Sequence, residues 1–145
     1  MAICSRSSES AASDYNDYLG SFVDWGTNKI GNDAPNTWRT LSYDEWNYLL
    51  NTRTNASSLK GVAQVNGVNG LIFLPDNWSS PKGLTFKSGF HYSSWRDNQS
   101  FSLEQWSLLE KAGAIFLPAA GGISPYDLVS GVQTDGSYWS SSAKD

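Results

Sequence analysis

The sequence predicts an α+β domain in which two helices pack on a small sheet. Two segments each combine a helix-capping pair with apolar residues at helical spacing, and short β-prone runs stand between turn residues. The chain has 145 residues, a length that favours one domain able to bury a core without disulfides. We expect residues 1–13, rich in Ser and Ala, to form a flexible lead, and residues 14–145 to form a single domain.

Composition excludes several classes of function. Only 17% of the residues are charged and the formal net charge is −4, so the chain lacks the basic field that binds nucleic acids or anionic membranes. Apolar runs are a few residues long, whereas a membrane span needs about 20, so we expect no membrane insertion. One cysteine, Cys4, and one histidine, His91, exclude an intrachain disulfide and the commoner zinc sites. We expect neither metal nor cofactor.

The first helix is expected at about residues 43–53. Ser42 and Glu45 form an S-x-x-E capping box, in which each side chain can accept a hydrogen bond from the other residue's backbone N–H. Apolar residues then follow at spacings of three and four and predict one buried face, made of Tyr43, Trp46, Leu49 and Leu50.

A β-hairpin is expected next. Residues 62–65 and 71–74 are short β-prone runs, and the segment 66–70 between them offers two Asn-Gly steps for a tight reversal. Pro75 should end the second strand, because proline cannot donate to a sheet.

The second helix repeats the logic of the first. Ser102 and Gln105 form a capping pair, Leu103, Trp106 and Leu109 fall on one face, and Gly113 suits the left-handed position after a helix. A buried strand is expected at residues 114–117, and a last strand at residues 138–142.

Two long segments, residues 76–100 and 119–136, are expected to be recognition loops, because long loops in compact domains are usually functional. Aromatic rings there could stack on sugars or anchor a protein, and the candidate ligand-binding residues are Trp78, His91, Tyr92, Trp95 and Tyr126. The other tryptophans are expected in the core: Trp46 and Trp106 on helix faces, with Trp38 and Trp139 sealing it.

Catalytic and metal chemistry find little support in the sequence. No Gly-x-Ser-x-Gly elbow exists, so a catalytic triad would need His91 in an irregular loop. The triplets at residues 34–36 and 75–77 superficially resemble the proline-containing calcium ligands of sugar-binding lectins, but no cluster of carboxylates accompanies them. We therefore expect a protein that is not an enzyme, with an unrecognised site around His91 as an alternative.

Four ordered motifs carry a family resemblance. They are WRTLSYDEW at residues 38–46, GLIFLPDNW at 70–78, GAIFLPAAG at 113–121 and GSYWSSS at 136–142. Together they resemble a family of surface-associated domains of gut Bacteroidetes, akin to the Fibrobacter succinogenes major paralogous domain. The first motif is also similar to the helix start of formylglycine-generating, sulfatase-modifying-factor domains. Both resemblances imply a C-type-lectin-like fold, with two helices packed on a twisted antiparallel sheet and long loops.

This resemblance implies a non-enzymatic binding or adhesion module, secreted or on a bacterial surface, with an unknown glycan or protein ligand. The alternative is a phage or retroelement receptor-binding variable protein of the same fold. The oxidising enzymes of the wider fold use cysteines in their C-terminal part, and this sequence has none after Cys4. The relatives are expected to continue beyond the last motif. Self-association through the C-terminal strand, a substitute strand from residues 14–26, or a fragment of a longer chain would each account for the difference.

Overall fold

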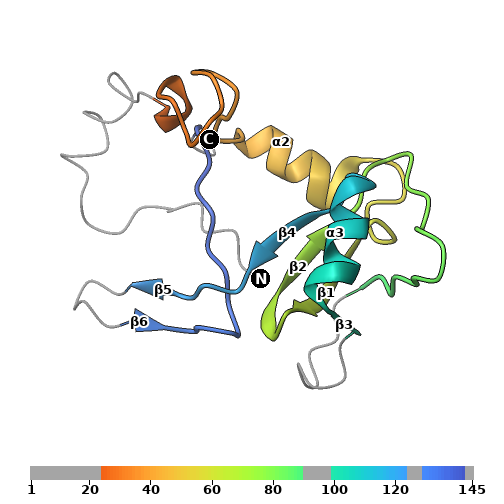
Figure 1. Ribbon diagram of the computed structural model, residues 1–145. Helices are drawn as coiled ribbons and strands as arrows, with labels where there is room; N and C mark the ends of the chain where they lie inside the picture. Colours follow the sequence, from red (N-terminus) through yellow and green to blue (C-terminus); the bar gives the residue numbers. More distant parts are fainter. Residues whose placement is uncertain (1–23, 90–98, 124–128, 143–145) are drawn as a thin grey trace. The chain divides into compact units, whose positions relative to one another are not determined.

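The computed structural model describes residues 24–89, 99–123 and 129–142 (Figure 1). They belong to two compact units. The sheet unit contains residues 48–137, and the terminal unit combines residues 24–47 with residues 138–142. The described residues contain both helices and strands, which confirms the α+β class. The lead at residues 1–13 lies outside the described residues, and the single domain expected for residues 14–145 stays a prediction.

The sheet unit is built on a four-stranded mixed sheet in the order β3-β1-β2-β4 (Figure 1). Its strands are β1 (Lys60–Val65), β2 (Val68–Phe73), β3 (Gln99–Phe101) and β4 (Ile115–Pro118). Neighbours β1 and β2 pair antiparallel, as do β2 and β4, but β1 and β3 pair parallel. The expected antiparallel sheet is therefore wrong at one pair. The reason lies in the path of the chain: β2 ends beside the start of β1, Gly89 pairs in the parallel sense with Gly61 near that same end, and β3 continues in this direction from Ala63 onward.

The hairpin of β1 and β2 turns on the first Asn-Gly step. Val65 pairs with Val68, so the loop is only two residues long. Asn66 and Gly67 both have positive φ angles, 50° and 80°, as a type I′ turn requires. The expected hairpin is confirmed, although β2 starts earlier than predicted because the second Asn-Gly step lies within the strand. There, a Cβ on Gly70 would lie 2.4 Å from the Phe116 ring, so glycine permits the close approach of β4.

Helix α3 (Leu103–Lys111) lies over one face of the sheet (Figure 1). Ser102 and Gln105 form the expected capping box, and Gly113 has the expected positive φ of 94°. Leu109 is fully buried, and the ring of Trp106 lies 5.7 Å from that of Phe116. The core comprises Leu59, Ala63, Val65, Ile72, Leu74, Phe101, Leu109 and Ala114, with Trp78, Leu84, Phe86, Trp106 and Phe116 packed against it.

Two expectations of burial are wrong in this unit. Leu103 is 57% exposed although it was assigned to the buried face of α3. It is the first helical residue, and side chains in a helix tilt toward the N-terminus, so it extends past the packed turns. Strand β4 is not fully buried either, since Ile115 is 58% exposed. This strand is at the edge of the sheet, and its packing onto α3 is made through Phe116.

Arg53 joins three segments of the sheet unit. It is 5% exposed and directly follows the π-helical turn η2 (Tyr48–Thr52). The backbone N–H of Arg53 donates to the carbonyl of Tyr48 and so closes this turn. Its guanidinium donates to the backbone carbonyl oxygens of Leu49, Leu59 and Leu74 at 3.0, 3.0 and 2.8 Å. The end of the helical segment, the start of β1 and the end of β2 are thereby tied to one cation.

The first helix extends nearly as expected, over α2 (Tyr43–Asn47) in the terminal unit and then η2. The Ser42 and Glu45 capping box is formed, at 2.9 and 3.2 Å. Trp46 is 8% exposed, which confirms its burial, and its ring lies 6.1 Å from that of Tyr138. Its indole N–H donates to the carbonyl of Trp139 at 3.1 Å.

The strand expected at residues 138–142 is wrong, because this described stretch is irregular. Ser141 donates its backbone N–H to the carbonyl of Leu41 at 2.9 Å, and the hydroxyl oxygen of Ser142 caps α2 by accepting from the N–H of Tyr43 at 3.0 Å. The Ser140 hydroxyl donates to the carbonyl of Ser142 at 2.6 Å, a local side-chain bond of the kind that competes with a sheet ladder. Self-association through this stretch stays a prediction.

We expect Trp106→Ala to lower the free energy of unfolding by about 3–5 kcal/mol, because a large aromatic side chain is removed from the packing between helix and sheet. Trp46→Ala should cost a similar amount within the terminal unit. The matched control is Leu103→Ala on the same helix, which should cost less than about 0.5 kcal/mol because the side chain is exposed. Denaturant midpoints measure the differences, and equal midpoints for Trp106→Ala and Leu103→Ala would contradict the packing.

Arg53→Met should destabilise the sheet unit by at least about 3 kcal/mol, because the hydrogen bonds from the guanidinium to three carbonyl oxygens are lost. Arg53→Lys should fail to restore the parent's stability, since an ammonium lacks the guanidinium's planar array of donors. Asp76→Asn is the control: the Arg53–Asp76 ion pair is 3.3 Å long, but Asp76 is 60% exposed, so its loss should cost less than about 1 kcal/mol. Thermal unfolding followed by circular dichroism measures all three, and equal effects of Arg53→Met and Asp76→Asn would refute the assignment.

Candidate ligand-binding surface

Of the residues predicted to bind a ligand, only Trp78 is described. It is half-buried and packs against the hydrophobic core of the sheet unit. The remaining candidates, His91, Tyr92, Trp95 and Tyr126, lie outside the described residues. Recognition through all five residues therefore stays a prediction, and Trp78 in addition packs against the core.

The described part of the 76–100 segment is anchored to the sheet. Phe86 packs against the core, and Gly89 exchanges backbone hydrogen bonds with the edge of β1, donating to Lys60 at 2.9 Å and accepting from Val62 at 3.3 Å. The Gln99 side chain bonds both the N–H and the carbonyl of Lys87 at 2.7 Å. Residues 76–89 thus extend the folded sheet unit.

The 119–136 segment is fixed in a similar way. It contains the short strands β5 (Gly122–Ile123) and β6 (Val129–Ser130), which pair antiparallel (Figure 1). Gln133 holds it to β2: its side-chain oxygen accepts from the N–H of Asn69 at 2.7 Å, and its carbonyl accepts from the Asn69 amide at 2.8 Å. Asn69 is buried and Gln133 is exposed, so this clamp is partly shielded from water.

Exposed tryptophans gather in the terminal unit. Trp25 is 55% exposed, Trp38 52% and Trp139 73%. The expectation that Trp38 and Trp139 seal the core is wrong. In the described part of this unit, all exposed large hydrophobic side chains are tryptophans, and we call these three residues the tryptophan surface.

Trp25 and Trp38 are held at the backbone segment 38–41, and Trp139 is near in sequence to a residue that contacts it. Trp25 begins the short helix η1 (Trp25–Thr27), and its indole N–H donates to the Thr40 hydroxyl at 2.9 Å. Trp38 belongs to the segment itself, and its indole N–H donates to Asp33 at 2.7 Å. Trp139 lies two residues before Ser141, whose N–H bonds the carbonyl of Leu41.

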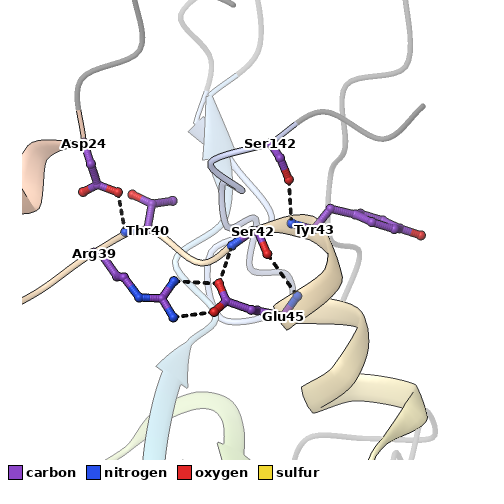
Figure 2. Close-up of polar contacts among 7 residues, drawn as sticks. All are labelled: Asp24, Arg39, Thr40, Ser42, Tyr43, Glu45 and Ser142. Carbon is purple, nitrogen blue, oxygen red and sulfur yellow. Dashed lines mark hydrogen bonds and ion pairs between the residues drawn. The ribbon is translucent and has the colours of Figure 1, made fainter.

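A polar network holds the same segment in place (Figure 2). One carboxylate oxygen of Asp24 accepts the N–H of Gly26 at 2.8 Å and the other accepts the N–H of Thr40 at 2.7 Å. The Arg39 guanidinium donates to both carboxylate oxygens of Glu45, one of them at 2.6 Å. Glu45 also accepts the N–H of Ser42, so ion pair and helix cap share one side chain.

These contacts shift the acidities of the network. The hydrogen bonds from Arg39, followed by the one from the Ser42 backbone, lower the pKa of Glu45 from 4.5 to about 2. The backbone N–H groups of Gly26 and Thr40 lower the pKa of Asp24. The hydrogen bonds to Glu45 raise the pKa of Arg39. Each of these shifts favours the charged form of its group.

The described residues hold no cluster of three or more His, Cys, Asp or Glu side chains. In the 75–77 triplet, Asp76 bonds Arg53 and the Tyr48 hydroxyl, and the latter bond raises the pKa of Tyr48. In the 34–36 triplet, the carbonyl of Ala34 accepts the Thr37 hydroxyl at 2.7 Å, which is turn chemistry.

Comparison with known proteins finds no matching family model, no matching curated protein and no matching solved structure. No helix among the described residues is both long and apolar enough to span a membrane.

The tryptophan surface was missed because an isolated tryptophan looks like a core residue in a sequence. One signal was available. Between residues 24 and 40, Ile30 is the only aliphatic residue of valine size or larger, so the tryptophans of this stretch have few apolar partners for a core. Trp139, between tyrosine and serine residues, has a similar setting.

We expect acid to weaken the terminal unit through Glu45. Its pKa of about 2 in the folded protein is below the ordinary 4.5, so the folded state favours the carboxylate. The stabilisation is fully present above about pH 5 and is lost as the pH falls from 4.5 to 2. Urea unfolding of the parent and Glu45→Gln, followed by tryptophan fluorescence, tests this.

The parent should be the more stable protein at pH 7, and its advantage over Glu45→Gln should shrink steadily toward pH 2. Glu104→Gln is the matched control in the sheet unit, where the Ser102 hydroxyl lowers the pKa of Glu104 as well. This variant also removes an acidic side chain with a lowered pKa, but it leaves the contacts of Glu45 in place. An advantage for the parent that grows as the pH falls would refute the role of Glu45.

Proposed function

We propose that this chain is a non-enzymatic ligand-binding or adhesion module of C-type-lectin-like fold, related to the surface-associated domains of gut Bacteroidetes. The α+β class and the two capped helices are compatible with that fold. In this proposal the protein acts outside the cell or at its surface, and a protein or glycan is its ligand.

The tryptophan surface is the observation that carries the proposal. Exposing a tryptophan forgoes the stabilisation gained by burying an aromatic side chain, so three exposed indoles in one small unit need a reason. Tryptophan is enriched among the residues that dominate binding energy, because it offers a large, rigid contact area. A recognition role supplies that reason.

Residues 90–98 and 124–128 of the two expected recognition loops are a second element of the proposal. His91, Tyr92 and Trp95 belong to the first of these stretches and Tyr126 to the second. Both stretches leave from anchored chain: Gly89 is paired with β1, and β5 and β6 flank the second stretch. Such anchored loops are a common position for recognition residues.

Screening the purified chain against immobilised glycans and purified host extracellular proteins tests the function. We expect at least one of them to bind the parent reproducibly, and Trp139→Ala to weaken that binding at least about ten-fold, because the most exposed indole is removed. Surface plasmon resonance measures the affinities.

Leu103→Ala is the matched control, since it removes an exposed apolar side chain from the sheet unit. Trp95→Ala and Tyr126→Ala separate the loops from the tryptophan surface. Binding unaffected by Trp139→Ala but lost in the loop variants would move recognition to the loops. Failure of every glycan and protein to bind would refute the binding function.

A further inference from the structure

We propose that the tryptophan surface binds carbohydrate, with the indole rings of Trp25, Trp38 and Trp139 stacking on sugar rings. This inference rests on the proposed function and specifies its ligand class. It concerns residues of the terminal unit only.

The first argument is the kind of apolar group that is exposed. In the described part of the terminal unit, the exposed large hydrophobic side chains are flat indoles, without exposed Val, Leu, Ile or Met beside them. In the sheet unit they are mainly aliphatic, as with Leu103, Ile115 and Val132. The centres of protein-binding surfaces are enriched in methionine and arginine as well as in aromatic rings. Isolated flat rings instead suit a flat ligand with C–H groups on its faces, as a pyranose has.

The second argument is the state of the indole N–H groups. Trp25 and Trp38 already donate theirs to Thr40 and Asp33, at 2.9 and 2.7 Å. A ligand therefore meets the ring and need not supply an acceptor for these donors. The face of an aromatic ring carries partial negative charge, which attracts the partially positive C–H groups on the face of a sugar.

The third argument is charge, which separates sugars from nucleic acids. Stacked bases also suit exposed indoles, but they bring phosphates that need free cations. The described part of the terminal unit holds two cations, Lys29 and Arg39, against four carboxylates. The guanidinium of Arg39 is paired with both carboxylate oxygens of Glu45. The whole chain carries a formal net charge of −4. A neutral polyhydroxylated ligand fits this electrostatic setting.

The fourth argument is the polar chain around the rings. Between Trp25 and Trp38 the sequence is rich in amide and hydroxyl side chains: Thr27, Asn28, Asn32, Asn36 and Thr37. Thr27, Asn28 and Thr37 donate to backbone carbonyls of their own stretch, which leaves their oxygens to accept from sugar hydroxyls. The amides of Asn32 and Asn36 can both donate and accept. Backbone contacts order this stretch, since Asn36 donates its N–H to the carbonyl of Gly26 at 2.7 Å. An ordered surface loses little entropy on binding.

Titration with defined oligosaccharides tests the ligand class. The probes are the hexasaccharides of β-linked glucose, xylose, mannose and N-acetylglucosamine, with α-linked glucose as a fifth, followed by calorimetry and tryptophan fluorescence. We expect at least one to bind and to change the fluorescence. Trp25→Ala, Trp38→Ala and Trp139→Ala should each weaken its binding at least about ten-fold, and Leu103→Ala should leave it unchanged.

Trp25→Phe and Trp38→Phe keep an aromatic face but lose the indole N–H, so they should retain more affinity than the alanine variants. Circular dichroism and melting temperatures verify that each variant is folded. Three results would overturn the inference: no hexasaccharide binds while a protein ligand binds through the same tryptophans; sugar binding survives all three alanine variants; or sugar binding vanishes with EDTA but not with the variants. The first leaves the proposed function standing, whereas failure of both sugars and proteins to bind refutes the function itself.

Discussion

The sheet unit depends on one buried cation. Arg53 is 5% exposed, and its guanidinium donates to the carbonyl oxygens of three leucines that end or begin different elements. Its Cζ also lies 5.9 Å from the centre of the Phe73 ring, on β2. A buried charge is costly unless hydrogen bonds replace its hydration, and here backbone carbonyls replace most of it. The arrangement is specific, because only a planar group with several donors can reach all three segments at once.

In the terminal unit, carboxylates rather than a cation satisfy the backbone groups. It has little regular structure, so many of its backbone N–H groups need acceptors outside helices and strands. Asp24 accepts two of them, from Gly26 and Thr40, and Glu45 accepts a third, from Ser42. The ion pair of Glu45 with Arg39 is exposed, so we attribute the order of this segment mainly to the hydrogen bonds made to backbone. Carboxylate side chains thereby accept N–H groups that neighbouring strands would accept in a sheet.

Local signals in the sequence predicted local structure well. Both capping boxes and the hairpin are formed, because each depends on residues at most a few positions apart. Long-range pairing was harder to predict. Nothing near Gln99 indicates that β3 runs parallel to β1. Residues 138–142 were expected to form a strand, but the hydroxyl of Ser142 caps α2 instead. The expected burial of Trp38 and Trp139 was wrong for the same reason. Whether a tryptophan such as Trp38 is buried depends on apolar partners far away in the chain, and the sequence does not show which residues these are.

The two kinds of tryptophan in this chain show how burial and hydrogen bonding are connected. Trp46 is buried and donates its indole N–H to the carbonyl of Trp139, which satisfies a polar group that water cannot reach. Trp25 and Trp38 are exposed, so water could satisfy their N–H groups, yet both make bonds within the protein. Those bonds contribute little to stability at an exposed position, but they restrict the rotation of each ring. A fixed ring loses less conformational entropy when a ligand covers it, so the same bonds that matter little for folding favour binding.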